Sequence, residues 1–325
     1  MKSIVRGIAI LVASVAVLHG APSQAQDYPV KPVTMIVPWA AGGAVDTLAR
    51  IVQPKLSERL GKPVVIENRP GGGSTIGTAA GAKAPPDGYL LGMPGSGSMA
   101  ISPAMYKSLP YDPVKDIVPV ALVGRVPFVL IVHKDLPIKS VPELIKYAKE
   151  KQLNFGSGGA GSPHHLYAEM LKGMTGAPMT HVPYKGSADA IKDVVAGHIQ
   201  MLFSDPAPSV PLIRSNTVRA LGVSTKERWA VAPEIAPLNE AGVPGFDAAG
   251  WFMVAVSPGT PKPVVDRLHA EFKAVMAMPD VQEKVNRTGV VAVVSPSLDD
   301  LSKFVRSEID RWGKVVRQAG LAGTL

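Results

Sequence analysis

Hydrophobic positions along the chain alternate between short β-rich runs and longer stretches with helical spacing. In the first part of the chain, strands are expected at 33–39, 62–70 and 89–94, and helices at 45–61 and within 70–84. This order is typical of a mostly parallel sheet with helices on its faces. Residues 119–135 are again strand-rich, and we expect the chain to leave the first unit there.

A second series of strands and helices follows the first. Strands are expected at 153–157, 180–186, 199–205, 218–225 and 252–258, and helices at 140–152, 187–198, 261–277 and 298–320. Another helix is expected to begin at Pro163 and end at Gly173, and Ser187 and Gly197 are expected to bound the helix at 187–198. The strand–glycine–helix unit therefore recurs in each half of the chain. Ligands of such sheets bind beyond the carboxyl ends of the strands, where helix N-termini gather.

Length and composition favour a folded protein with two hydrophobic cores. The chain has 325 residues, of which 46% are hydrophobic. A single core rarely serves one α/β domain much longer than about 250 residues. Glycine and proline are abundant, but they separate periodic segments and form no low-complexity blocks.

The first residues have the pattern of a secretory signal peptide. Lys2 and Arg6 form a basic start, residues 7–18 are apolar, and Ser23 and Ala25 supply small residues for cleavage after Ala25. The apolar run is shorter than the roughly 20 residues that span a bilayer. We therefore expect residues 1–25 to be removed and the protein to be periplasmic.

Charge and cysteine content exclude several classes of function. The sequence has 34 Lys and Arg residues and 26 Asp and Glu residues, and it has no cysteine. Disulfides, thiolate metal sites and cysteine nucleophiles are therefore excluded. The positive charge is spread along the chain, whereas nucleic-acid binding needs a concentrated basic surface. We expect no nucleic-acid partner.

A glycine-rich stretch, FGSGGAGSPHH, separates an expected strand from an expected helix. Gly156, Gly158 and Gly161 have the G-x-G-x-x-G spacing of a dinucleotide site, but the next strand ends in Lys185 and Gly186, without the acidic residue that would hold a ribose. Ser162 and Pro163 are a favourable pair for starting a helix. The stretch is better interpreted as a cup of backbone amides and serine hydroxyls for a small anion. A purely structural tight turn is the alternative.

The stretch PWAAGGAVDTLAR has the same organisation in the first half of the chain. Gly42 and Gly43 allow the backbone to approach a ligand closely. Asp46 lies in the first helical turn, where it either stabilises the helix and pairs with Arg50 or faces the ligand. Trp39, at the strand end, is either a core residue or one wall of the site.

Signatures of enzymes are weak. The sequence has no G-x-S-x-G, no H-E-x-x-H and no Walker A motif. His164 and His165 are about 100° apart on a helix, so they cannot both face one metal. His164, His165 or His181 either donates to a ligand or has a structural role. The enzymatic alternative is an exported hydrolase that uses Ser157 with His165 or His181.

Several blocks, in order, resemble the substrate-binding proteins of tripartite tricarboxylate transporters, the Bug-type family. They are PWAAGGAVDTLAR, ENRPGGGSTIG, YDPVKDIVPVALVGRVPFVLIVHKDLP, NFGSGGAGSPHHLYAEML, THVPYKGSADAIKDVVAGHIQ and LNEAGVPGF. The resemblance implies an α/β, type II periplasmic-binding-protein fold, in which crossing hinge strands join two α/β lobes around a ligand cleft. It implies a first lobe of residues 26–126 plus 248–325 and a second lobe of residues 127–247.

The resemblance also implies which residues bind the ligand. In lobe 1 they are Trp39, Ala41, Gly42, Gly43, Asp46 and Ser96, and in lobe 2 they are Ser157, Gly158, Gly161, Ser162 and His165, with Tyr184, Phe203 and Asp205 as the far wall. FSDPAPSV, which contains Asp205, is richer in proline than the usual run of this family.

The expected function is that of a receptor rather than an enzyme. The resemblance implies a periplasmic solute-binding protein that captures a small carboxylate, without a cofactor or metal, and delivers it to a membrane permease or a sensor kinase. Candidate ligands are di- or tricarboxylates, amino acids and aromatic acids, the last because Trp39, Phe203 and Trp251 could stack on a ring. We expect the protein to act as a monomer.

Overall fold

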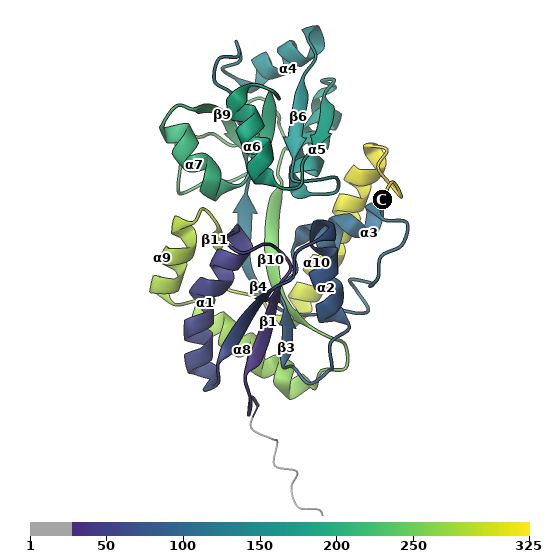
Figure 1. Ribbon diagram of the computed structural model, residues 1–325, viewed down its shortest axis with the longest axis vertical. Coiled ribbons are helices and arrows are strands. Elements are labelled where there is room, and N and C mark those ends of the chain that lie inside the picture. Colours follow the sequence, from purple (N-terminus) through teal and green to yellow (C-terminus); the bar gives the residue numbers. More distant parts are fainter. Residues whose placement is uncertain (1–27) are drawn as a thin grey trace, which may run out of the picture.

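The computed structural model describes residues 28–325, and the expected signal peptide, residues 1–25, lies outside them. The chain forms two α/β lobes, one above the other in Figure 1, each built on its own sheet. Within the described residues, none of the helices combines the length and the apolar character needed to cross a membrane.

Lobe 1 is built on a six-stranded sheet with strand order β11-β4-β10-β3-β1-β2. Its strands are β1 (Val33–Val37), β2 (Val64–Asn68), β3 (Leu90–Gly92), β4 (Val118–Pro127), β10 (Ala249–Val256) and β11 (Val291–Ala292). Its helices are α1 (Ala44–Leu60), η1 (Gly72–Ser74), α2 (Thr75–Ala82), η2 (Gly97–Ile101), α3 (Ser102–Met105), α8 (Lys262–Met276), α9 (Pro279–Arg287) and α10 (Leu298–Gln318). β1 pairs in parallel with β2 and β3, as the sequence pattern predicts.

Lobe 2 is built on a five-stranded sheet with strand order β7-β6-β8-β5-β9. Its strands are β5 (Val129–His133), β6 (Asn154–Ser157), β7 (Thr180–Pro183), β8 (Met201–Ser204) and β9 (Val218–Val223). Its helices are α4 (Val141–Glu150), α5 (Pro163–Thr175), α6 (Ser187–Ala196) and α7 (Pro206–Arg214). Helices cover both faces, because Leu130 and Val132 of β5 belong to one apolar cluster and Val129 and Ile131 to another.

Two extended segments connect the lobes. β4 ends where β5 begins, and the chain returns from β9 to β10 through residues 224–248. Ser224 joins the two crossings: its hydroxyl accepts from the Phe128 amide at 2.9 Å and donates to the Ala248 carbonyl at 2.6 Å. We keep the division into 26–126 plus 248–325 and 127–247 as a proposal for the two lobes.

The C-terminal helix α10 links the lobes a third time (Figure 1). Trp312 of α10 stacks on Tyr167 of α5, with ring centroids 5.3 Å apart. The buried Glu308 carboxylate accepts from the indole N–H groups of Trp251 at 2.8 Å and Trp312 at 3.1 Å. The core is therefore continuous from one lobe to the other behind the hinge strands.

One expected helix boundary is wrong. α5 continues through Gly173 and ends at Thr175, because Gly176 has the left-handed conformation (φ 64°) that terminates a helix at little cost. α6 begins at Ser187, as expected, and Gly186 precedes it as the N-cap. Ser140 caps α4, Ser162 caps α5 and Gly197 ends α6, as predicted.

Candidate ligand-binding site

The carboxyl ends of the parallel strands carry the predicted site residues in both lobes. In lobe 1, β1 leads into α1, β2 into η1 and α2, and β3 toward η2. In lobe 2, the parallel strands β6, β7 and β8 lead into α5, α6 and α7. Helix N-termini present free N–H groups and a partial positive charge. One edge of each lobe therefore has the electrostatic character of an anion site.

The lobe 1 loop joins β1 to α1. Ala41, Gly42 and Gly43 are exposed, and Gly43 precedes α1 without a side-chain cap on the helix. Gly42 has φ 82°, a conformation that residues with a side chain adopt only at a cost. The loop is therefore exposed at the start of a helix.

Asp46 holds the lobe 1 loop from below. Its Oδ2 accepts from the Gly42 amide at 2.8 Å and from Arg50 at 2.9 Å, and its Oδ1 accepts from Asn68 at 3.0 Å. Asn68 also donates to the Trp39 carbonyl at 3.1 Å. Burial works to raise the pKa of the Asp46 carboxyl, but the hydrogen bonds from Arg50, Gly42 and Asn68 hold that pKa below its usual value. The Asp46 side chain is buried and both of its carboxylate oxygens accept hydrogen bonds from within lobe 1, so its role is structural.

The lobe 2 loop, residues 157–162, folds back on itself through two serines. The Gly159 carbonyl accepts from the Ser157 hydroxyl at 3.0 Å and from the Ser162 hydroxyl at 2.7 Å. Ser162 also accepts from the His165 amide and so caps α5. Gly159 and Gly161 have φ 116° and 78°, which explains why this turn requires glycines.

Stacked aromatic rings support the lobe 2 loop. His165 and His181 stack with their centroids 3.7 Å apart, and both stack on Phe155. Nε2 of His181 lies 2.6 Å from Ser157 Oγ, and Nδ1 of His165 accepts from the Gly161 amide at 3.2 Å. Burial lowers the pKa of His165 to about 3 and that of His181 to about 4. Both rings are therefore neutral supports of the loop at neutral pH.

The segment around Ser96 connects the two loops. A Cβ on Gly95 would lie 3.0 Å from the ring of Trp39, and a Cβ on Gly97 would lie 3.8 Å from Pro163 at the start of α5. Ser96 is buried beside the hinge strand β10. Gly97 of lobe 1 and Pro163 of lobe 2, which follow the candidates Ser96 and Ser162 in the chain, thus lie close together.

Two aromatic residues considered as ligand contacts lie in the core. Phe203 has no exposed surface and packs between Tyr167 and Phe246. Trp251 is 1% exposed and its N–H is bound to Glu308. The prediction that Phe203 and Trp251 face a ring is therefore wrong, because their side chains fill the space behind the sheets. Trp39 is half-buried against Phe252.

Two residues predicted to form the far wall of the site in lobe 2, Tyr184 and Asp205, make hydrogen bonds within the protein. The Tyr184 hydroxyl donates to Asp193 at 2.6 Å. Asp205 precedes α7 and accepts from Nε2 of His164 at 3.0 Å. Sequence reasoning missed the supporting role of Asn68, and it named His165 but not His164 among the ligand-binding residues.

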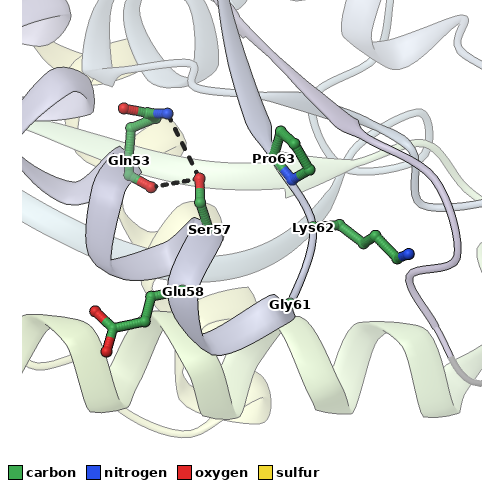
Figure 2. Close-up of a pocket in the computed structure, with 6 residues that line it drawn as sticks. All are labelled: Gln53, Ser57, Glu58, Gly61, Lys62 and Pro63. Atoms are coloured by element: carbon green, nitrogen blue, oxygen red, sulfur yellow. Dashed lines mark hydrogen bonds between the residues drawn. The ribbon is translucent and has the colours of Figure 1, made fainter.

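Two surface hollows lie away from these loops. One, of about 400 Å³, is lined by the end of α1 and the turn into β2 (Figure 2). Gln53 there donates to the Val64 carbonyl and Ser57 accepts from the Val64 amide, so these side chains fasten β2 to α1. The other, of about 430 Å³, lies between the end of α4 and the start of β7.

The structure gives the hydrolase alternative little support. Ser157 is completely buried, its hydroxyl lies between the Gly159 carbonyl and Nε2 of His181, and the His181 ring stacks on Phe155 and His165. A nucleophile must reach its substrate and be aligned with a base that a third group orients. This arrangement supports a loop instead.

Comparisons with known proteins give a consistent result. A family model described as the tripartite tricarboxylate transporter family receptor matches residues 48–321. The solved structure of Rpa4515 from R. palustris with adipate has 37% sequence identity and a TM-score of 0.84, over 91% of this chain and 99% of that one. The periplasmic binding protein BugD has 32% identity and a TM-score of 0.82, over 91% and 99% of the two chains. MatC from Rhodopseudomonas palustris with bound malate has 32% identity and a TM-score of 0.79, over 89% and 100%.

These similarities confirm the predicted α/β, type II-like periplasmic-binding fold with two lobes. They also settle the class of protein, since members of this family are solute-binding receptors and not enzymes. The chain belongs to the receptor family of the tripartite tricarboxylate transporters, the Bug-type solute-binding proteins.

Proposed function

We propose that this receptor captures a small organic carboxylate between the facing edges of its two lobes. The supporting observation is the pairing of two glycine-rich loops, 39–43 and 157–162, each at the start of a long helix. Neither loop contains Lys or Arg. The free N–H groups and positive ends of α1 and α5 are suited to an anion that is small enough to fit between the loops. The adipate and malate complexes of two similar proteins support this ligand class.

The expected affinity is compatible with neutral donors. A micromolar ligand requires about −8 kcal/mol. A handful of hydrogen bonds at about 1 kcal/mol each, with burial of the ligand's carbon chain as the lobes close, is sufficient. With Phe203 and Trp251 in the core, aliphatic acids fit the residues at the loops better than aromatic acids do.

We further propose that the receptor acts in the periplasm and delivers its ligand to a membrane permease or a sensor kinase. The N-terminal pattern of Lys2, Arg6 and a short apolar run supports export. The family description supports a transporter as the recipient.

Thermal-shift measurements against mono-, di- and tricarboxylates and the corresponding amides test the ligand class. We expect at least one acid to raise the melting temperature and its amide to have no effect. Native mass spectrometry of the freshly purified protein would identify a co-purified acid. The proposal is wrong if none of the acids stabilises the protein and no acid is found bound.

The variant Gly43→Val tests the site itself. The Cβ of residue 43 would lie 3.4 Å from the Ala40 carbonyl and clash with nothing else, so the fold survives. The added side chain would occupy the place of the ligand next to the start of α1, and binding would be lost. Unchanged binding by this variant would remove the lobe 1 loop from the site.

A further inference from the structure

A segment that follows α10 is bound to lobe 1 along the end of α3. We call this segment, residues 323–325, the strap. The Leu325 amide donates to the Met105 carbonyl at 3.0 Å, and the Lys107 amide donates to the main-chain oxygen of Leu325 at 2.8 Å. The strap therefore runs beside α3, where Figure 1 shows the chain turning back after α10.

The Leu325 side chain reaches the candidate ligand loop of the other lobe. A Cβ on Gly161 would lie 3.2 Å from Met105 Sδ and 3.3 Å from Leu325 Cδ1. Gly161 belongs to the lobe 2 loop, residues 157–162, and its amide donates to Nδ1 of His165. The loop is thus bonded to a support in its own lobe and lies against two apolar side chains of lobe 1. We call these two side chains, Met105 and Leu325, the apolar seat.

The end of α3 also holds a glycine-rich turn of lobe 1. The Tyr106 hydroxyl donates to the Gly72 carbonyl at 3.2 Å. Gly72 begins η1, which follows β2 and precedes α2. The apolar seat therefore lies at the edge of lobe 1 that faces lobe 2, next to the loops of the candidate site.

The contact at Gly161 depends on how close the two lobes are. Leu325 is attached to lobe 1 through its main chain and lies against lobe 2 with its side chain. Separation of the two edges would break the side-chain contact and return apolar surface to water, which is unfavourable. A contact that exists in only one of two conformations shifts the equilibrium toward that conformation. The apolar seat therefore favours closed lobes.

We propose that Leu325 and Met105 are positioning residues for ligand binding: the lobe 2 loop closes against them, and the strap holds Leu325 in place. This inference rests on the proposed carboxylate-binding function and adds residues that determine how long a ligand stays bound, although they act through the loop. Leu325 lies beyond residues 48–321, which the family model matches, so the contact is a feature of this chain rather than of that match.

Stopped-flow fluorescence with adipate and malate, the acids bound in two similar proteins, tests the role of Leu325. In Leu325→Ala the acid is expected to dissociate about fivefold faster, because the variant removes apolar surface against which the loop closes. The association rate is expected to change by less than about twofold, since changes in contacts act mostly on dissociation. Leu325→Met, which keeps an apolar side chain of similar volume, restores slow release.

Removal of residues 323–325 tests the whole strap. The deletion also removes the bond from the Gly323 amide to the Ala104 carbonyl, and it is expected to speed dissociation at least as much as Leu325→Ala. Leu325 belongs to neither apolar cluster of the core, so the melting temperature of the ligand-free protein should stay within about 2 °C in both variants. A merely structural role would lower the melting temperature and leave dissociation unchanged.

The matched control is Met174→Ala. Met174 is 42% exposed, against 38% for Leu325, and lies at the end of α5 opposite to the lobe 2 loop. Its replacement is expected to leave dissociation unchanged.

The outcomes separate this inference from the proposed function. If Leu325→Ala and the deletion both release the acid at the wild-type rate, or if Met174→Ala speeds release as much as they do, the inference is wrong and the carboxylate receptor stands. If the wild-type protein binds none of adipate, malate, succinate and citrate, the proposed function fails, and the inference fails with it.

Discussion

The two glycine loops have equivalent positions in their lobes but are supported by different chemistry. Below the lobe 1 loop lies a charged network, in which Asp46 binds Gly42, Arg50 and Asn68. Below the lobe 2 loop lies a stack of neutral rings, Phe155, His165 and His181, joined to the loop through Ser157 and Gly161. In both arrangements the supporting side chains bind loop amides, those of Gly42 in lobe 1 and Gly161 in lobe 2, and so fix the loop in front of the start of α1 or α5.

The difference predicts that the two loops fail under different conditions. A carboxylate with a lowered pKa keeps its charge until the solution is strongly acidic. Buried histidines with lowered pKa values bind protons more weakly than histidines of the unfolded chain do. The free energy of unfolding therefore begins to fall as soon as the pH drops below the histidine pKa of the unfolded chain.

Among the substitutions, replacement of Asp46 by alanine is expected to have the largest effect. The variant leaves the Gly42 amide and the Asn68 amide without their acceptor below the loop, at a cost of roughly 2–4 kcal/mol in the free energy of unfolding. Urea denaturation measures it. The matched control is Asp189→Ala, which removes the exposed pair with Lys192 and should cost less than about 0.5 kcal/mol. A loss below about 1 kcal/mol in Asp46→Ala would show that the charged network does not hold the loop.

Acidification is expected to destabilise the protein through the lobe 2 histidines. In the fold their pKa values are about 3 for His165 and about 4 for His181, whereas an unfolded chain takes up these protons near pH 6.5. The stabilisation is therefore complete above about pH 6.5 and is lost as the pH falls toward 4, by roughly 6 kcal/mol for the two histidines together. Urea titrations at about pH 7, 5.5 and 4.5 measure the slope.

A variant with phenylalanine at both His165 and His181 is the control for this pH dependence. It retains stacking on Phe155 and removes the titrating groups, so its stability should change much less over the same range. An equally steep slope in this variant would place the pH sensitivity elsewhere and remove the contrast between the loops.

Replacement of Gly158 or Gly43 by alanine is expected to have the smallest effect on the free energy of unfolding. The two variants compare the packing around the two loops directly. At Gly158 the new Cβ lies 3.2 Å from the Ser187 nitrogen and needs a shift of its neighbours, which costs about 1 kcal/mol. At Gly43 the backbone is extended (φ −74°, ψ 171°) and the space is open, so the change should stay within about 0.5 kcal/mol. Equal losses at the two positions would contradict the tighter packing assigned to the lobe 2 loop.

The sequence predicted the parallel strand–helix units, their order and the loops between them. This succeeded where hydrophobic spacing and capping residues agreed, as at Ser162 and Pro163 before α5. It failed at Gly173, because a glycine within a helix and a glycine that ends a helix look alike until the backbone angle is known. Gly176, three residues later, has that angle.

The roles of individual side chains were harder to predict. Phe203 and Trp251 lie in sequence blocks typical of a binding site, yet both side chains are buried. Their strands are covered on both faces, so an aromatic residue near a strand end can belong to the core as easily as to the wall of a binding site. His164 and His165 are neighbours in sequence, yet one pairs with Asp205 and the other stacks on His181. Their different roles depend on the tertiary structure, which places His181 of β7 beside His165 and Asp205, in the turn before α7, beside His164.

By itself, the sequence determined two series of strand–helix units with a glycine-rich loop in each half, because periodicity, capping and turn chemistry are local properties of the chain. Its resemblance to a known family indicated the two-lobed receptor. The tertiary structure decided which polar groups have hydrogen-bond partners within the protein, because folding supplies those partners: it gives them to Asp46, His165 and Tyr184 and withholds one from Ser74 and from Nδ1 of His164.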